Sequence, residues 1–203
     1  MRQMIRRLSL ILIAMATLLN TSCGDEAAAA FIDKGRSLQV AYEVDVVIAG
    51  GSSAAVSAAV NTVAQGSSVF LLADRPYLGE DLCTTLNLAL GAGEKPIAPL
   101  SKEIYGDAIV TRPSQIKIAL DKALVEARVP FLTGSYPCEV VVDAGGKFAG
   151  ITMVNRSGRQ FVKAKVLIDA TENAFLARQT ALSFAAFKAV TCSKFGLGRR
   201  TSI

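Results

Sequence analysis

Residues 44–74 read VDVVIAGGSSAAVSAAVNTVAQGSSVFLLAD, and this stretch decides the fold. It begins with the compact apolar run 44–49, which is rich in β-branched residues and predicts a buried strand. A helix is predicted over 54–65, because small alanines recur on one face and Gly66 supplies a usual helix end. A second buried strand is predicted over 68–73, and Asp74 follows it. The expected unit is therefore strand, glycine turn, helix, strand and acid.

The turn between this first strand and the helix has the features of a dinucleotide-binding loop. Its first glycine allows a tight turn, its second special position lets the backbone approach a pyrophosphate, and its third must be small so that helix and strand can pack. The phosphates would lie on N–H groups at the helix N-terminus, and the acid would bind ribose hydroxyls. We predict that Asp74 is this acid and that the six residues of the turn cradle the pyrophosphate. These six are Gly50, Gly51, Ser52, Ser53, Ala54 and Ala55.

The turn departs from the G-x-G-x-x-G pattern at two positions. Ala55 stands at the third glycine position, where alanine is commonly accepted. Ser52 stands at the second, where its side chain would either clash with the pyrophosphate or donate its hydroxyl to a phosphate oxygen. An ordinary βαβ crossover without a ligand is the alternative interpretation of the same pattern.

The composition supports an α/β domain and excludes several kinds of chemistry. The chain has 203 residues, of which 51% are hydrophobic and 6% aromatic, and it contains no histidine. Histidine-based triads and zinc sites that need imidazole are therefore excluded. The four cysteines form no C-x-x-C pair, so no metal site is predicted. The net charge of +5 owes much to the two ends of the chain, so no face for nucleic acid is predicted.

The first 30 residues have the pattern of an export signal. A basic start precedes the apolar run 8–19, which is short for a membrane span and typical of a secretory signal core. The segment 20–23 resembles a bacterial lipoprotein signal, in which Cys23 would be lipidated and attach the protein to a membrane. Residues 27–30 offer an ordinary secretory cleavage site instead. We expect an exported protein, periplasmic or anchored by lipid; an uncleaved N-terminal anchor is the remaining alternative.

Residues 75–81 read RPYLGED and extend the pattern beyond the βαβ unit. With this stretch, residues 44–178 resemble the FAD-dependent oxidoreductases of the glutathione-reductase-like superfamily, and in particular a group of exported bacterial members. The resemblance implies FAD as the cofactor. It also implies a Rossmann-like FAD/NAD(P)-binding domain with a central parallel sheet and a small antiparallel β-meander.

The resemblance implies further contacts with the cofactor. In this superfamily a loop after the second strand runs beneath the flavin end, a backbone segment near 137–139 contacts adenine, and a later strand returns to the cofactor. Glu172 follows this returning strand at a position where glycine is usual. The residues implied to contact the cofactor are Arg75, Glu80, Asp81, Cys138, Asp169, Ala170 and Thr171.

The remaining elements are predicted from periodicity and turn residues. Apolar residues at helical spacing predict a helix over 114–128. Strands are predicted over 129–132, 139–142, 148–155, 160–163 and 166–168, with hairpin turns at 145–146 and 157–158. Residues 31–41 are expected to be a short lead-in to the first strand. The domain is therefore expected to span residues 31–203.

Three functional interpretations follow, and the sequence names no catalytic acid or base for any of them. The first is an FAD-dependent oxidoreductase, or its FAD-binding fragment, with an unidentified small-molecule substrate. Enzymes of this type usually also carry a substrate domain and a closing segment, so the chain is expected to be truncated and to bind FAD weakly. The second is a non-catalytic exported Rossmann-like protein with weak or no nucleotide binding. The third is a related dehydrogenase that binds NAD.

Overall fold

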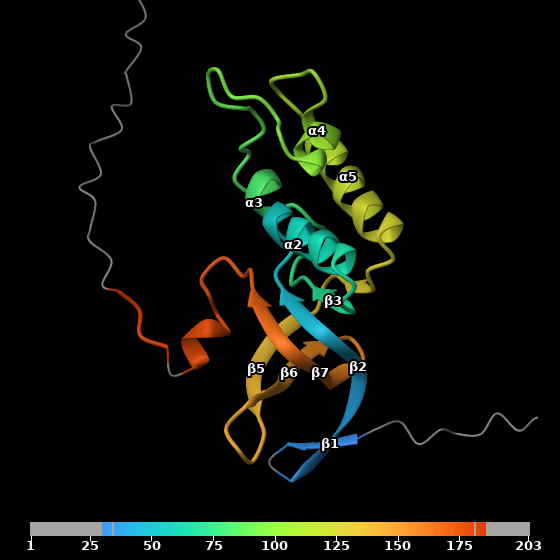
Figure 1. Ribbon diagram of the computed structural model, residues 1–203, viewed down its shortest axis with the longest axis vertical. Coiled ribbons are helices and arrows are strands. Elements are labelled where there is room, and N and C mark those ends of the chain that lie inside the picture. The colour runs from blue at the N-terminus through green and yellow to red at the C-terminus, as the bar shows by residue number, and fades with distance from the viewer. Residues whose placement is uncertain (1–29, 34, 181, 186–203) are drawn as a thin grey trace, which may run out of the picture.

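A computed structural model describes residues 30–33, 35–180 and 182–185 (Figure 1). The predicted export signal, including Cys23, and the tail from residue 186 lie outside these residues. Within the described segments, no helix is both long enough and apolar enough to cross a membrane. The elements are β1 (Ala30–Asp33), β2 (Arg36–Ala49), α2 (Ser53–Ala64), β3 (Val69–Leu72), α3 (Glu80–Cys83), α4 (Pro99–Tyr105), α5 (Pro113–Glu126), β4 (Phe131–Leu132), β5 (Tyr136–Val142), β6 (Phe148–Asn155), β7 (Gly158–Asp169) and the short 3-10 helix η1 (Ala177–Gln179).

The strands form one mixed sheet in the order β4-β3-β2-β7-β6-β5, and β1 pairs with β2 beside this path. The pairs β4–β3, β3–β2 and β2–β7 are parallel, whereas β7–β6 and β6–β5 are antiparallel. This arrangement confirms the predicted α/β fold with a central parallel sheet. The antiparallel strands β5 and β6, together with the first half of β7, form the predicted meander.

Helices cover one face of the parallel strands, and Figure 1 shows α2 and α5 side by side above the ends of β2 and β7. The core on this side is formed by residues such as Ile48, Ala55, Leu71 and Leu120, all of which are fully buried. A second core lies on the opposite face and joins the parallel strands to the meander. Its members are Val47, Ala49, Phe70, Leu72, Ile151, Met153, Val162, Ala164 and Leu176.

Successive residues of the central strands alternate between the two cores. Val46 and Ile48 belong to the helix side, whereas Val47 and Ala49 belong to the meander side. A parallel strand with both faces covered must be apolar on both faces, which explains the continuous run at 46–49. Phe70 is the largest fully buried side chain of the second core.

Helix α2 spans Ser53–Ala64, one residue earlier at each end than the predicted 54–65. The Ser52 side chain accepts the N–H of Ala55 at 3.1 Å and so caps the helix N-terminus. Ala55 and Ala59 are fully buried, and their small size lets the helix lie close to the sheet. Gly66 follows the C-cap residue with φ of +85°, a conformation that glycine adopts without a steric penalty.

Four predictions about strand boundaries were wrong. Strand β4 is shorter than the predicted 129–132, and β5 begins at Tyr136 rather than at residue 139. Residues 31–41 are not a lead-in, because they form most of β1 and the first part of β2. Residues 160–163 and 166–168 belong to one continuous strand, β7. The exposed Lys163 and Lys165 flank the buried Ala164, so the alternation of a strand continues through a segment that is polar in sequence. Strand β7 pairs with β6 through its first half and with β2 through most of its length, so its backbone is hydrogen-bonded across the segment where the prediction placed a gap.

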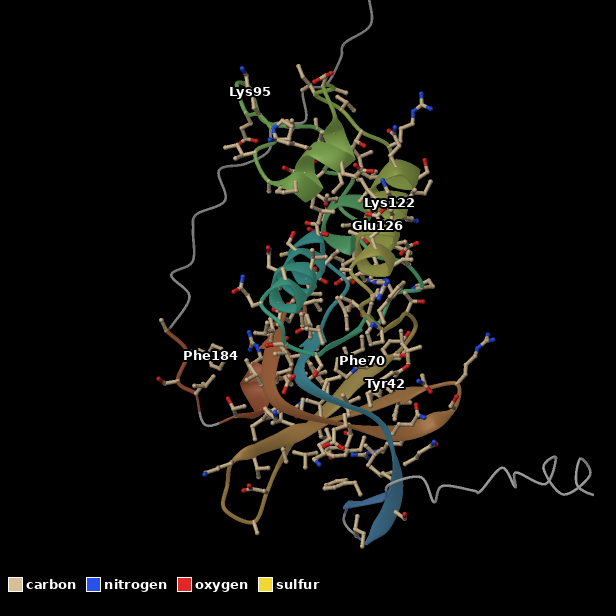
Figure 2. The ribbon with its side chains drawn as sticks, turned by 45° about the vertical axis from the view of Figure 1, so that its right-hand side comes forward. Tyr42, Phe70, Lys95, Lys122, Glu126 and Phe184 are labelled. Atoms are coloured by element: carbon tan, nitrogen blue, oxygen red, sulfur yellow. The ribbon has the colours of Figure 1, made fainter. Side chains whose placement is uncertain are left out.

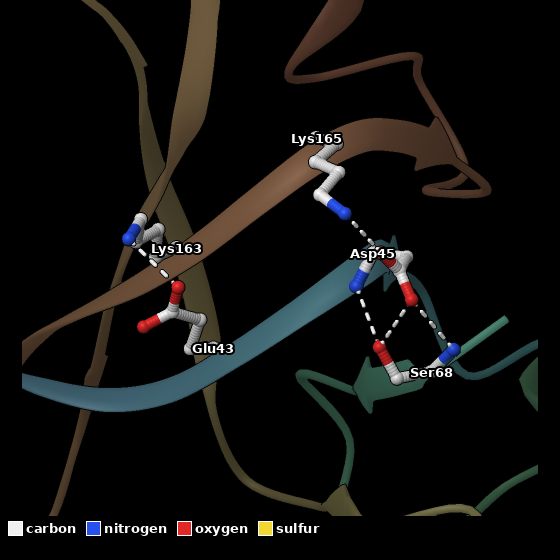
Figure 3. A network of polar contacts seen from close by, with 5 residues as sticks. All are labelled: Glu43, Asp45, Ser68, Lys163 and Lys165. Carbon is white, nitrogen blue, oxygen red and sulfur yellow. Dashed lines mark hydrogen bonds and ion pairs between the residues drawn. The ribbon is translucent and has the colours of Figure 1, made fainter.

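A polar network joins β2 and β7 to the start of β3, as Figure 3 shows. The Asp45 carboxylate accepts the N–H of Ser68 at 3.0 Å and its O–H at 2.6 Å, while the Asp45 N–H donates to Ser68 Oγ at 2.8 Å. Lys165 Nζ lies 2.6 Å from the other Asp45 oxygen. Asp45 therefore connects β2 with the start of β3 and with β7.

We expect this network to make stability depend on acid pH. The hydrogen bond from Lys165, followed by those from Ser68, lowers the pKa of Asp45 well below its ordinary value. Ionised Asp45 therefore stabilises the fold above the ordinary aspartate pKa of about 4, and this contribution is lost as the pH falls through the lowered pKa. Urea unfolding should show Asp45→Asn less stable than wild type at pH 7, with the difference shrinking at lower pH.

The matched control is Glu43→Gln. Glu43 also bonds a β7 lysine, Lys163, at 2.7 Å, but both side chains are more than half exposed, so little effect is expected. A stability difference for Asp45→Asn that is the same at pH 7 and at pH 3 would contradict the role given to the carboxylate.

Candidate functional site

A cavity of about 290 Å³ lies where the parallel strands end. Ala49 at the end of β2 is in register with Leu72 of β3 and with Asp169 of β7, so the carboxyl ends of three neighbouring strands meet at one edge. Ligands of open α/β sheets bind at this edge. The residues that line the cavity are Gly50, Asp74, Glu80, Tyr136, Pro137, Thr171, Glu172, Asn173 and Phe175.

Gly50 makes the tight turn off β2 and has no space for a side chain. Its φ is +125°, and a Cβ atom built there would lie 2.3 Å from the carbonyl oxygen of Ala170. Its N–H donates to the Leu72 carbonyl at 2.8 Å. The neighbouring Gly51 is almost as confined, since its Cβ would lie 2.8 Å from that of Ala73. The turn is therefore held between the ends of β3 and β7.

Ser52 occupies the second glycine position without backbone strain. Its φ of −71° and ψ of 162° are ordinary extended values. Its oxygen accepts the Ala55 N–H, as described above, which leaves the hydroxyl hydrogen able to donate. Ala55 itself is fully buried and packs in the helix-side core, whereas Ala54 is exposed at the start of α2. The serine and alanine replacements therefore fit the turn without backbone strain at Ser52.

Asp74, which we predict to be the ribose-binding acid, lies at the cavity. It follows β3 and lines the cavity together with Gly50. The preceding Ala73 is fully buried, so it faces the core. The neighbouring Arg75 is exposed and is not among the cavity-lining residues, although its N–H donates to Asp74 Oδ1 at 2.9 Å.

Two further acids from the start of α3 bond directly to the turn. The N–H of Gly51 donates to Glu80 Oε1 at 3.3 Å. The N–H of Ser53 donates to Asp81 Oδ1 at 2.9 Å, and the Ser53 hydroxyl donates to Asp81 Oδ2 at 2.5 Å. The N–H of Gly79 also donates to the Gly51 carbonyl at 2.7 Å. The first turn of α3 is therefore fastened to the predicted phosphate loop by carboxylates.

The cavity carries negative charge. Asp74, Glu80 and Glu172 all line it, and the Asp74 and Glu80 side chains hydrogen-bond to each other. Burial, followed by the charge of Asp74, raises the pKa of Glu80 above its ordinary value, while the Gly51 N–H and Arg75 act in the opposite direction.

The segment after β7 is organised by Asp169. Its Oδ1 accepts the Thr171 N–H at 3.0 Å and the Thr171 hydroxyl at 2.6 Å, and its Oδ2 accepts the Ala177 N–H at 2.7 Å. Asp169 is therefore turned toward its own loop. Of the three residues predicted here, Thr171 lines the cavity, while Ala170 contributes the carbonyl that faces Gly50.

The other side of the cavity comes from β5 and from the loop after β7. Cys138, predicted near this side, is half-buried on β5 with its sulfur 3.5 Å from the Tyr136 carbonyl, but the cavity lining comes from its neighbours Tyr136 and Pro137. Sequence reasoning missed Tyr136, Asn173 and Phe175. Tyr136 and Phe175 are about half exposed, and no periodicity marks a residue that lies at the rim of a cavity.

Comparisons with known proteins identify a family and similar structures. Residues 45–186 match the family described as FAD dependent oxidoreductase. A geranylgeranyl bacteriochlorophyll reductase-like protein from Thermoplasma acidophilum is similar in structure, with 19% identity over 70% of this chain and 42% of that chain, and a TM-score of 0.50. THI4 of Thermovibrio ammonificans is 13% identical over 83% of this chain and 68% of that chain, with a TM-score of 0.48. Comparison with curated protein sequences finds no match.

The fold and the cavity define a dinucleotide-binding domain, since a glycine turn, a helix N-terminus and an acid after the second strand meet at one edge of a parallel sheet. Because the family match covers most of the described residues, the chain belongs to the FAD-dependent oxidoreductase family, whose cofactor is FAD. The chain spans 42% of the length of the reductase-like protein from Thermoplasma acidophilum.

Proposed function

We propose that this chain is the FAD-binding part of an FAD-dependent oxidoreductase that acts on a small-molecule substrate. The observation that carries the proposal is the shared cavity of Gly50 and Asp74, because it brings the predicted phosphate loop and the predicted ribose acid together at the ends of β2 and β3. Small-molecule sites usually measure about 300–1,000 Å³. A cavity of about 290 Å³ suits one half of a dinucleotide, and its lining suits the adenosine half.

The residues present fit this cofactor. Asp74 would accept hydrogen bonds from ribose hydroxyls, and the start of α2 would face the pyrophosphate, where the helix dipole favours negative charge. Tyr136, Pro137 and Phe175 would bound the adenine, since they supply the apolar side of the cavity. When bound, FAD supplies the hydride chemistry, and the protein supplies binding, orientation and electrostatics.

The export signal is part of the same proposal. We infer an exported protein, either periplasmic or attached to a membrane through a lipid on Cys23, and the support is the sequence pattern of the first 30 residues. The group of exported bacterial proteins that the chain resembles is consistent with this location.

The decisive experiment follows the visible spectrum of the purified chain during titration with FAD, because binding is expected to be weak. A change in flavin absorption that saturates as FAD is added is expected. A chain that takes up neither FAD nor NAD would support a non-catalytic Rossmann-like protein instead. Uptake of NAD without FAD would support the dehydrogenase alternative.

Asp74→Asn should weaken binding of FAD and of ADP-ribose about tenfold or more, because hydrogen bonds to a charged acceptor contribute about 1.5–3 kcal/mol and tenfold corresponds to about 1.4 kcal/mol. Isothermal titration calorimetry would measure both affinities. Asp121→Asn is the control, since Asp121 is exposed on α5 and should leave both affinities unchanged. Equal affinities for Asp74→Asn and wild type would remove Asp74 from the site.

A further inference from the structure

The contact between Ser53 and Asp81 has the form of a bound anion. One carboxylate oxygen accepts the backbone N–H of Ser53 and the other accepts its hydroxyl, at 2.9 and 2.5 Å. Both contacts are partly buried and join residues 28 positions apart in the sequence. A phosphate group binds a loop in the same way, since two of its oxygens accept hydrogen bonds from neighbouring donors.

Ser53 lies at the helix N-terminus, where a bound phosphate would accept hydrogen bonds from free N–H groups. It is the first residue of α2, so its N–H points out of the helix N-terminus and has no partner inside the helix. The N–H of Ala55, two residues further along, is already taken by the Ser52 side chain. The Ser53 N–H and hydroxyl are therefore central to the anion-binding capacity of this turn, and Asp81 holds both.

Glu80 adds a second carboxylate to the same turn. It accepts the Gly51 N–H at 3.3 Å, which is a longer and weaker contact than those of Asp81, and it also lines the cavity beside Asp74. Both acids come from the first turn of α3, which is fastened to the loop by the Gly79 N–H as well. An incoming pyrophosphate thus meets two carboxylates on the donors that it would use.

We propose that Asp81 is an internal competitor of the pyrophosphate and so determines how tightly this site binds phosphate-containing nucleotides. This inference rests on the proposed function. Pyrophosphate binding displaces the Asp81 carboxylate from Ser53, and the free energy of the lost contact is subtracted from the affinity. Adenosine carries no phosphate, so its binding does not involve this exchange.

The test compares ADP and adenosine as probes on the full chain. Asp81→Asn keeps the size of the side chain but removes the charge. We expect it to bind ADP about tenfold more tightly than wild type, with adenosine affinity changed less than about twofold. Asp107→Asn is the matched control, because Asp107 is an exposed aspartate in the loop after α4, and it should change neither affinity.

A purely structural role for Asp81 gives the opposite result. If Asp81 only positions the loop, Asp81→Asn binds ADP more weakly than wild type or equally well, and either outcome overturns the inference. Tighter binding of ADP and adenosine alike also overturns it. If wild type and all variants bind neither probe nor FAD, the proposed function fails first. If wild type binds the probes but Asp81→Asn does not bind ADP more tightly, the inference about Asp81 is wrong and the proposed function still stands.

A measurement on the wild-type chain covers the case in which the variant does not fold. The carboxyl carbon of Asp81, observed by NMR with labelled aspartate, should shift on addition of ADP and stay in place on addition of adenosine. An Asp81 signal that does not respond to saturating ADP overturns the proposed exchange.

Discussion

Gly50→Ala should cost at least about 3 kcal/mol of unfolding free energy and abolish nucleotide binding, because two unfavourable effects coincide at this position. The φ of +125° is strained for any residue with a Cβ atom, and that atom would lie 2.3 Å from the Ala170 carbonyl oxygen. The loop can accommodate the methyl group only by separating the end of β2 from the segment after β7. Since both segments form the cavity, the cavity is lost with them.

Gly66→Ala is the comparison that distinguishes backbone strain from steric overlap of the added methyl group. Gly66 also has a positive φ, +85°, but a Cβ atom there meets nothing within 4 Å. Its replacement should cost only about 1–2 kcal/mol and leave ADP affinity unchanged. Urea unfolding and calorimetry on both variants would measure the two effects. Similar costs at the two positions would show that the contact with Ala170 is unimportant.

Phe70→Ala should lower the free energy of unfolding by about 3–5 kcal/mol, the range for truncating a buried phenylalanine. Phe70 is fully buried in β3, and its ring stacks on that of Tyr42 with centroids 3.8 Å apart (Figure 2). The cavity left behind would lie in the core that joins the parallel strands to the meander. Because this core holds both layers together, the loss should appear in the global unfolding transition measured in urea.

Phe184→Ala provides the comparison for Phe70. The Phe184 side chain is 56% exposed, and its ring lies 5.8 Å from the Arg178 guanidinium. Its truncation should change stability by less than about 0.5 kcal/mol, as for surface positions in general. If Phe70→Ala were equally mild, the stacking and burial at Tyr42 would not stabilise the fold.

The βαβ unit was predictable because each of its features is local. A largely apolar run at 44–49, a glycine pair and a run of small residues lie within one continuous stretch, and each has a single common structural outcome. Asp74 could likewise be chosen from the sequence, because the neighbouring Ala73 has no side-chain group that could bind a hydroxyl. The structure places Ala73 in the core and Asp74 at the cavity.

The contacts that modify the site were not predictable in the same way. The sequence suggests Glu80 and Asp81 as cofactor contacts, whereas the structure shows each bonded to the turn itself, 29 and 28 residues away. No periodicity links such positions, because the contact depends on where α3 is fastened by Gly79. Asp169 is a similar case: the resemblance implies a cofactor contact for it, whereas in the structure its carboxylate accepts hydrogen bonds from the backbone of the loop that follows β7.

The pairing of β2 with β7 also has a consequence for synthesis of the protein. Contacts such as that of Glu43 with Lys163 join residues 120 positions apart. One edge of β2 therefore stays without its partner on the ribosome until β7 has been made, and the same holds in a translocated chain that folds from its N-terminus. An unpaired apolar strand is a template for aggregation. Completion of β7 is thus the step that ends this exposure, and delays in translation before residue 169 would prolong it.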